Sequence, residues 1–70
     1  MRKNLKWFRL QRSLTQQQMA DIIGCCRATY NKVEKGERDG KITEFWLRIE
    51  KHFNVQPDEM LSLMYNEVSE

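Results

Sequence analysis

Residues 14–36 read LTQQQMADIIGCCRATYNKVEKG, and this stretch contains the local signals that decide the fold. Thr15 is a hydroxyl residue of the kind that caps a helix N-terminus, and an apolar pattern with helical period follows it. Gly24 can adopt the left-handed conformation that ends a helix, and Gly36 can end a second helix in the same way. The sequence therefore predicts two short helices joined by a tight turn: Gln16–Ile23 and Arg27–Lys35.

The spacing of small and apolar residues fits a helix-turn-helix, in which two short helices meet at a three- or four-residue turn that contains glycine. Ala20 stands four residues before Gly24, where a small side chain lets the two helices approach closely. Tyr30 and Val33 stand six and nine residues after that glycine, where the second helix has to turn its apolar face toward the first. We therefore predict a helix-turn-helix over about residues 15–35.

Helical periodicity also precedes this stretch. Leu5 and Phe8 form an apolar stripe within residues 4–12, and Asn4 can cap that helix.

Two more helices are expected after it. Thr43 can cap the first of them, Asn54 can end it, and Pro57 suits the first position of the second. The apolar row of the first recurs at i, i+4 and i+8: Phe45, Ile49 and Phe53. No segment alternates as a strand would, so we predict an all-α fold, a compact bundle of five short helices in a single domain over residues 1–70.

Length and composition restrict the class of protein. The 70 residues suffice for one small domain, and 40% hydrophobic with 31% charged residues is typical of a globular chain. The two cysteines, Cys25 and Cys26, are adjacent, which excludes a disulfide framework and a zinc site built on spaced pairs. Lys6 and Arg9 interrupt the apolar N-terminal residues, so we expect no signal peptide. The charge-free run Leu14–Ala20 is half polar, so we expect no membrane-spanning segment, and the cysteine usage favours a cytoplasmic location.

Charge is distributed unevenly along the chain. Residues 1–40 carry nine Lys or Arg and four Asp or Glu, a balance of +5, and residues 41–70 carry three and six, a balance of −3. The first part would attract a polyanion and the second would repel it. A gradual change of surface charge along a small soluble protein, without any such partner, explains the same numbers. The sequence contains no nucleophile–base pair, metal-ligand set or glycine-rich phosphate loop, so we expect no enzyme activity, metal, cofactor or small-molecule ligand.

A set of residues at fixed spacing carries a family resemblance: Leu14-Thr15-Gln16, Ala20, Gly24, Tyr30, Val33 and Glu34-Lys35-Gly36. With this set the sequence resembles the phage-repressor and Cro-like helix-turn-helix family, also called the Xre family, over about residues 4–64. It departs from the family pattern at Ser13, where a glycine usually ends the first helix, and at Cys26, where Ser or Thr usually caps the second helix of the motif. Because a thiol is a poor cap, we expect that second helix to fray more at its start.

The resemblance implies that helix Arg27–Lys35 is a recognition helix whose N-terminal residues enter the major groove of DNA. Arg27 would bind guanine O6 and N7, Asn31 would pair with adenine N6 and N7, and Lys32 would reach guanine or a phosphate. Ala28 would touch a thymine methyl group.

Residues around the recognition helix would contact the phosphates: Gln16, Thr29, Lys35, Arg38 and Lys41. Thr29 is the weaker candidate, since its side chain could be packed instead. The resemblance also implies a structural ion pair between Arg9 and Glu34, which would tie the first helix to the end of the recognition helix.

These implications predict a sequence-specific, repressor-like regulator of transcription, of bacterial or phage type, that binds double-stranded DNA. Since one recognition helix covers about half an operator, we expect a pseudo-palindromic operator and a weak homodimer. The expected dimer interface lies in the last helix and the tail: Leu61, Leu63, Met64, Tyr65 and Val68. In that helix the spacing of Met60, Leu61 and Met64 predicts that they pack against the core, so Leu63 is expected on another face.

A second function stays open, namely a helix-turn-helix module that binds a protein, antitoxin- or anti-repressor-like, with weak or no DNA binding. The acidic second part of the chain suits it. Salt dependence of duplex binding distinguishes the two, because phosphate neutralisation imposes a steep negative slope. Trp7 and Trp46 are expected to pack in the core, with one of them at a protein interface as the alternative.

Overall fold

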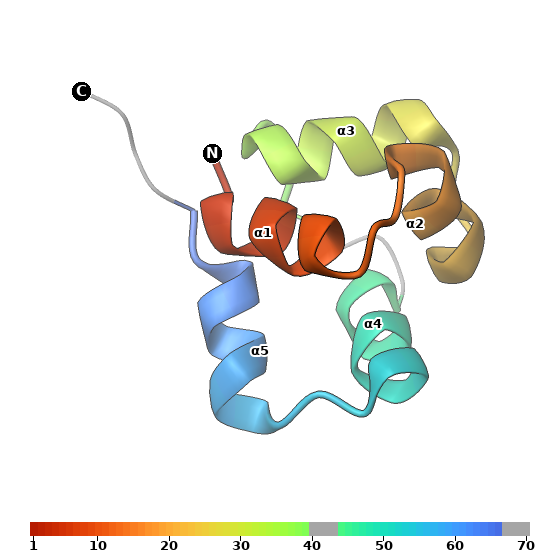
Figure 1. Ribbon diagram of the computed structural model, residues 1–70. Coiled ribbons are helices and arrows are strands. Elements are labelled where there is room, and N and C mark those ends of the chain that lie inside the picture. The colour runs from red at the N-terminus through yellow and green to blue at the C-terminus, as the bar shows by residue number, and fades with distance from the viewer. Residues whose placement is uncertain (40–43, 67–70) are drawn as a thin grey trace.

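The computed structural model describes residues 1–39 and 44–66, which form five α-helices and no strand (Figure 1). The helices are α1 (Lys3–Gln11), α2 (Gln16–Ile23), α3 (Arg27–Lys35), α4 (Phe45–Phe53) and α5 (Pro57–Met64). Figure 1 shows α1 in the middle of the fold, with α3 on one side of it and α4 and α5 on the other. The all-α prediction and the bounds of α2 and α3 are confirmed.

Every helix contributes apolar side chains to one core between these layers. The buried apolar residues are Leu5, Phe8, Met19, Ala20, Ile23, Tyr30, Val33, Phe45, Ile49, Val55, Met60 and Leu63. Aromatic rings join helices that are distant in sequence, since Phe8 meets Phe53 edge to face with centroids 5.1 Å apart. Burial of each large apolar side chain contributes about 1.5–3 kcal/mol, which is what holds such short helices together.

The local signals around the α2–α3 turn act as the sequence predicts. The Thr15 side chain accepts a hydrogen bond from the Gln18 backbone N–H, and the Gln18 side chain accepts from the Thr15 backbone N–H, a complete capping box. Gly24 and Gly36 end α2 and α3 with φ of 86° and 84°, in the left-handed region that glycine adopts without strain. Cys26 precedes α3 and its side chain makes no cap hydrogen bond, whereas the fraying expected at the start of α3 stays a prediction.

The prediction of Asn4 as a helix cap is wrong. Helix α1 begins one residue earlier, after Arg2, and Asn4 lies within its first turn. Its side-chain amide instead donates to the backbone oxygen and the hydroxyl of Ser62 on α5, at 3.2 and 3.0 Å. Asn4 therefore links α1 to α5, a role that only tertiary contact could assign. Thr43, the expected cap of α4, lies outside the described residues, and the N-cap position of α4 belongs to Glu44 instead, without a side-chain cap hydrogen bond.

The predicted orientation of α5 is wrong, and with it the place of Leu63 in a dimer interface. Leu63 is 3% exposed and packs in the core with Met60, whereas Leu61 is 71% exposed. The i, i+3 spacing of Met60 and Leu63 places both on the side of α5 that faces α1 and α4. Of the remaining expected interface residues, Val68 lies outside the described residues, and Met64 and Tyr65 are exposed.

The two tryptophans differ in environment. Trp7 on α1 is 62% exposed, so the prediction that it packs in the core is wrong. Trp46 is half-buried against Phe45, with ring centroids 4.8 Å apart, and its indole N–H donates to the Asp39 backbone oxygen.

Ser13 ends the turn after α1 with φ of 56°, in the left-handed region. A side chain there costs about 1–2 kcal/mol, partly offset by the lower unfolded-state entropy of serine, so we expect Ser13→Gly to raise the free energy of unfolding by about 0.5–1 kcal/mol. Urea unfolding followed by circular dichroism measures the change. Ser13→Ala, which keeps Cβ, is the matched control and should give no gain. A Ser13→Gly variant no more stable than the parent would show that the conformation carries no strain.

Candidate nucleic-acid interface

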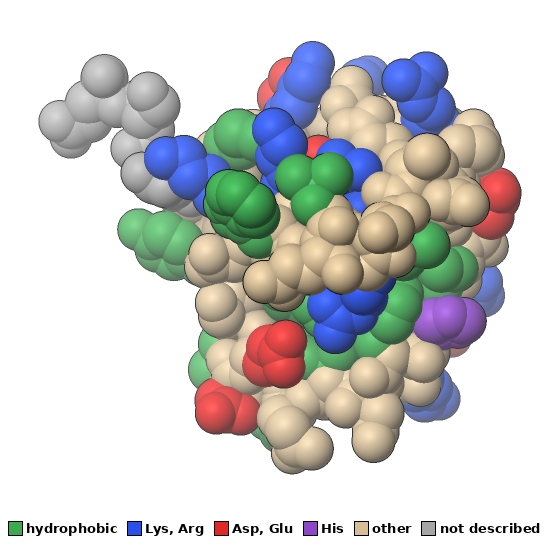
Figure 2. All heavy atoms as spheres, in the orientation of Figure 1, with side chains coloured by type: hydrophobic (Ala, Val, Ile, Leu, Met, Phe, Trp, Pro, Cys, Tyr) green, Lys and Arg blue, Asp and Glu red, His purple; other side chains and the backbone are tan. Residues whose placement is uncertain are grey.

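Helix α3 has one buried and one exposed face. Tyr30, Val33 and Glu34 face the core. The four predicted base-contact residues stand at i, i+1, i+4 and i+5: Arg27, Ala28, Asn31 and Lys32. Ala28 and Lys32 lie opposite the buried face, and Arg27 and Asn31 lie at its border beside Glu34. Three of the four are exposed and Asn31 is half-buried. The fold therefore brings all four to one outward surface little more than a helical turn long, and Figure 2 shows Lys and Arg side chains along the edge where α3 lies.

The predicted phosphate-contact residues surround that surface unequally. Lys35 and Arg38 are exposed at and just beyond the end of α3. Thr29 is half-buried and its Oγ1 lies 3.1 Å from Cys26 Sγ, so its hydroxyl already has a partner. Lys41 lies outside the described residues.

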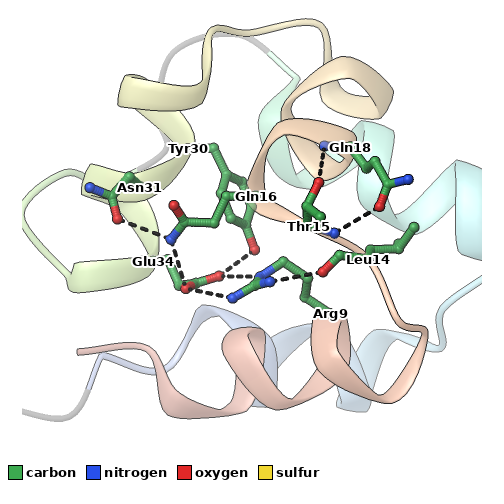
Figure 3. A network of polar contacts seen from close by, with 8 residues as sticks. All are labelled: Arg9, Leu14, Thr15, Gln16, Gln18, Tyr30, Asn31 and Glu34. Carbon is green, nitrogen blue, oxygen red and sulfur yellow. Dashed lines mark hydrogen bonds and ion pairs between the residues drawn. The ribbon is translucent and has the colours of Figure 1, made fainter.

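Arg9 and Glu34 form an enclosed ion pair beneath this surface (Figure 3). Arg9 Nε lies 3.0 Å from Glu34 Oε2 and Nη2 lies 3.4 Å from Oε1, while Nη1 donates to the Leu14 backbone oxygen at 2.8 Å. The Tyr30 hydroxyl donates to Glu34 Oε2 at 2.7 Å. The pair thereby holds α1, the start of α2 and α3 in one polar cluster.

Ionisation in this cluster follows from burial and from its hydrogen bonds. Burial alone would raise the pKa of Glu34, but the donors Arg9, Tyr30 and Gln16 outweigh it and hold that pKa below its ordinary value. Burial raises the pKa of Tyr30, and the adjacent carboxylate raises it further. Glu34 is therefore a carboxylate and Tyr30 a neutral donor at neutral pH.

Gln16, a predicted phosphate-contact residue, extends the cluster to the outer surface. It is the first residue of α2 and is half-buried. Its side-chain nitrogen donates to Asn31 Oδ1 at 3.0 Å and to Glu34 Oε1 at 3.3 Å (Figure 3). A chain of hydrogen bonds therefore runs from the buried ion pair to a predicted base-contact residue.

Arg2 is a structural residue that the sequence did not point to. It is 5% exposed, and its Nη1 donates to the backbone oxygens of Val33 and Arg38 at 2.6 and 2.7 Å. Its Nε donates to the Met64 oxygen at 3.1 Å, and its guanidinium lies over the Trp46 ring, 5.5 Å from the centroid. Arg2 thus fastens the ends of α3 and α5. Nothing local distinguishes it from a solvated arginine near a chain end.

Other kinds of site find no support in the described part of the chain. Among residues 1–39 and 44–66, no three His, Cys, Asp or Glu side chains gather that could hold a metal ion. No helix there is both long and apolar enough to cross a membrane.

Comparison with known proteins yields one match. A family model described as helix-turn-helix matches residues 5–60, most of the 70-residue chain. No curated protein and no solved structure matches the sequence.

Proposed function

The chain belongs to the Xre/Cro-like helix-turn-helix family, a family of DNA-binding regulatory domains and not of enzymes, and from this premise we propose that it is a sequence-specific regulator of transcription. In this proposal α3 enters the major groove of double-stranded DNA, and the bound protein represses transcription by occupying an operator. The observation that carries the proposal is the single outward surface of α3, on which Arg27, Asn31 and Lys32 lie together.

The chemistry of that surface matches base and phosphate recognition. Arg27 reads guanine through O6 and N7, Lys32 reaches guanine or a phosphate, and Ala28 touches a thymine methyl group. Lys35 and Arg38 contact phosphates through their side chains, and Gln16 contacts one through its backbone N–H at the start of α2, with Thr29 and Lys41 as further contacts.

A pseudo-palindromic operator requires two copies of the chain. Exposed apolar side chains near the end of the described chain support a weak homodimer through Leu61, Met64 and Tyr65. To read both halves of such an operator, the two copies need recognition helices about 34 Å apart, one turn of DNA. Leu63 takes no part, because it is buried within each copy.

A protein-interaction module is the second candidate function. The exposed indole of Trp7 favours it, because a large apolar ring in water is typical of a surface that a partner covers. In that case duplex binding would be weak and independent of base sequence.

Substitution on α3 tests the DNA-binding proposal. After selection of a preferred duplex from random sequences, we expect Arg27→Ala and Lys32→Ala each to weaken binding by about 1–3 kcal/mol, with Arg27→Ala also relaxing the preference at one base pair. Fluorescence anisotropy at several salt concentrations measures both the affinity and the slope. Lys51→Ala, which removes an exposed charge on α4, is the control and should have little effect. Parental affinity in both α3 variants would contradict the proposed docking.

A further inference from the structure

The Gln16 side-chain amide lies between a buried carboxylate and the outward surface of α3 (Figure 3). Its nitrogen carries two hydrogens, and the structure uses both: one toward Glu34 Oε1 at 3.3 Å and one toward Asn31 Oδ1 at 3.0 Å. Gln16 is therefore a donor to both neighbours.

Glu34 determines which end of the Gln16 amide faces inward. An ionised carboxylate only accepts hydrogen bonds, and Glu34 accepts from Arg9, Tyr30 and Gln16. A reversed Gln16 amide would place its oxygen against the carboxylate oxygen, where the two would repel each other. The buried ion pair thus fixes the Gln16 nitrogen in the position from which it also reaches Asn31.

The orientation of Asn31 follows in turn. A donor on Gln16 requires an acceptor opposite, so Asn31 presents Oδ1 to it. The Asn31 Nδ2 then points away from Gln16, as Figure 3 shows. Asn31 consequently offers an N–H donor to whatever approaches α3, while one lone pair of its oxygen is already used.

We infer that Gln16 is a specificity-determining residue, which acts by holding Asn31 in the orientation that donates a hydrogen bond to a base. This inference rests on the proposed DNA-binding function and deepens it. A donor selects bases with an acceptor on the major-groove edge, namely N7 and O6 of guanine, N7 of adenine or O4 of thymine, and rejects the N4 amino group of cytosine. A Gln16 that contacted phosphate alone would strengthen binding equally for all sequences.

Three variants separate positioning from simple contact. Gln16→Met has a similar length and donates no hydrogen bond, so it frees the Asn31 amide to turn over. Gln16→Lys also has a similar length and only donates, so it keeps the Asn31 oxygen turned inward. Asn31→Ala identifies the base pair that Asn31 reads. Thermal melts confirm folding, because Glu34 keeps its bonds to Arg9 and Tyr30 in every variant.

The experiment measures the binding of each variant to four duplexes that differ at a single base pair. This is the base pair at which Asn31→Ala abolishes the preference of the parent protein. We expect Gln16→Met to reduce discrimination against cytosine there by about tenfold, Gln16→Lys to retain it, and both to leave the base pair read by Arg27 unchanged. In the Asn31→Ala background, Gln16→Met should have no further effect at that position.

Retained discrimination in Gln16→Met, or an equal loss at every base pair, would overturn the inference and leave Gln16 as a sequence-independent contact. Failure of the proposed function looks different: the parent protein would then show no sequence preference on any duplex.

Discussion

Arg9→Met will lower the free energy of unfolding by about 3–5 kcal/mol, because it leaves the Glu34 carboxylate buried without its cation. Methionine keeps most of the apolar stem of arginine, so the loss reports the charge and its hydrogen bonds rather than a cavity. Glu34 and Arg9 also fix the end of α1, the start of α2 and the inner face of α3 through Leu14, Gln16 and Tyr30. A chain of this size has a total stability of roughly 4–10 kcal/mol, so such a loss would leave the fold marginal.

Urea unfolding at neutral pH measures the change. The exposed i, i+4 pair between Glu44 and Arg48, 3.3 Å apart, supplies the control. Glu44→Gln removes that pair and should lower the free energy of unfolding by less than about 1 kcal/mol, because solvent screens it. If Arg9→Met and Glu44→Gln lost equal stability, the enclosed character of the Arg9–Glu34 pair would be wrong.

The same pair predicts acid sensitivity. The hydrogen bonds to Glu34 hold its folded pKa below the ordinary value, so its stabilisation is complete above the unfolded pKa of about 4.3 and is lost as pH falls toward the folded value. We therefore expect Glu34→Gln, which cannot titrate, to show a shallower fall in unfolding free energy below about pH 4.5 than the parent. Unfolding curves between pH 3 and pH 7 give the two slopes, and identical slopes would contradict the lowered pKa.

The second large effect is expected at Arg2. Arg2→Met should lower the free energy of unfolding by about 2–4 kcal/mol, because three backbone oxygens, those of Val33, Arg38 and Met64, lose a charged donor. The Val33 and Met64 oxygens belong to the last turns of α3 and α5, where a positive charge also interacts favourably with the helix dipoles.

Thermal and urea unfolding measure the loss at Arg2. Lys6→Met, which removes an exposed charge from α1, the helix that follows Arg2, is the matched control and should change stability by less than about 0.5 kcal/mol. Arg2→Lys should recover part of the loss, since an ammonium group can reach fewer of the three oxygens at once. An Arg2→Met variant with the parental melting temperature would show that water replaces the guanidinium without cost.

The order and most ends of the helices follow from the sequence because their signals are local. Thr15, Gly24 and Gly36 act within one turn of the helix that each begins or ends, so their effect does not depend on the rest of the fold. Asn54 and Pro57 mark the end of α4 and the start of α5 in the same way. The outward surface of α3 is equally local, since Tyr30 and Val33 fix the inner face of that helix by their spacing alone.

Only the tertiary structure decided which of two equivalent helical faces is buried, and which polar groups meet across the core. In α5, the spacings Met60–Met64 and Met60–Leu63 both fit one face of a helix. The packing of α5 against α1 and α4 buries the second pair. The positions of Arg2 against Val33, Asn4 against Ser62 and Gln16 against Asn31 depend on residues 15 to 58 positions away. The sequence by itself determined the helices and the outward surface of α3, because period and capping operate over a few residues. The family resemblance implied the buried pair of Arg9 and Glu34, whereas packing alone determined the partners of Arg2, Asn4 and Gln16, because no local pattern encodes a contact between distant segments.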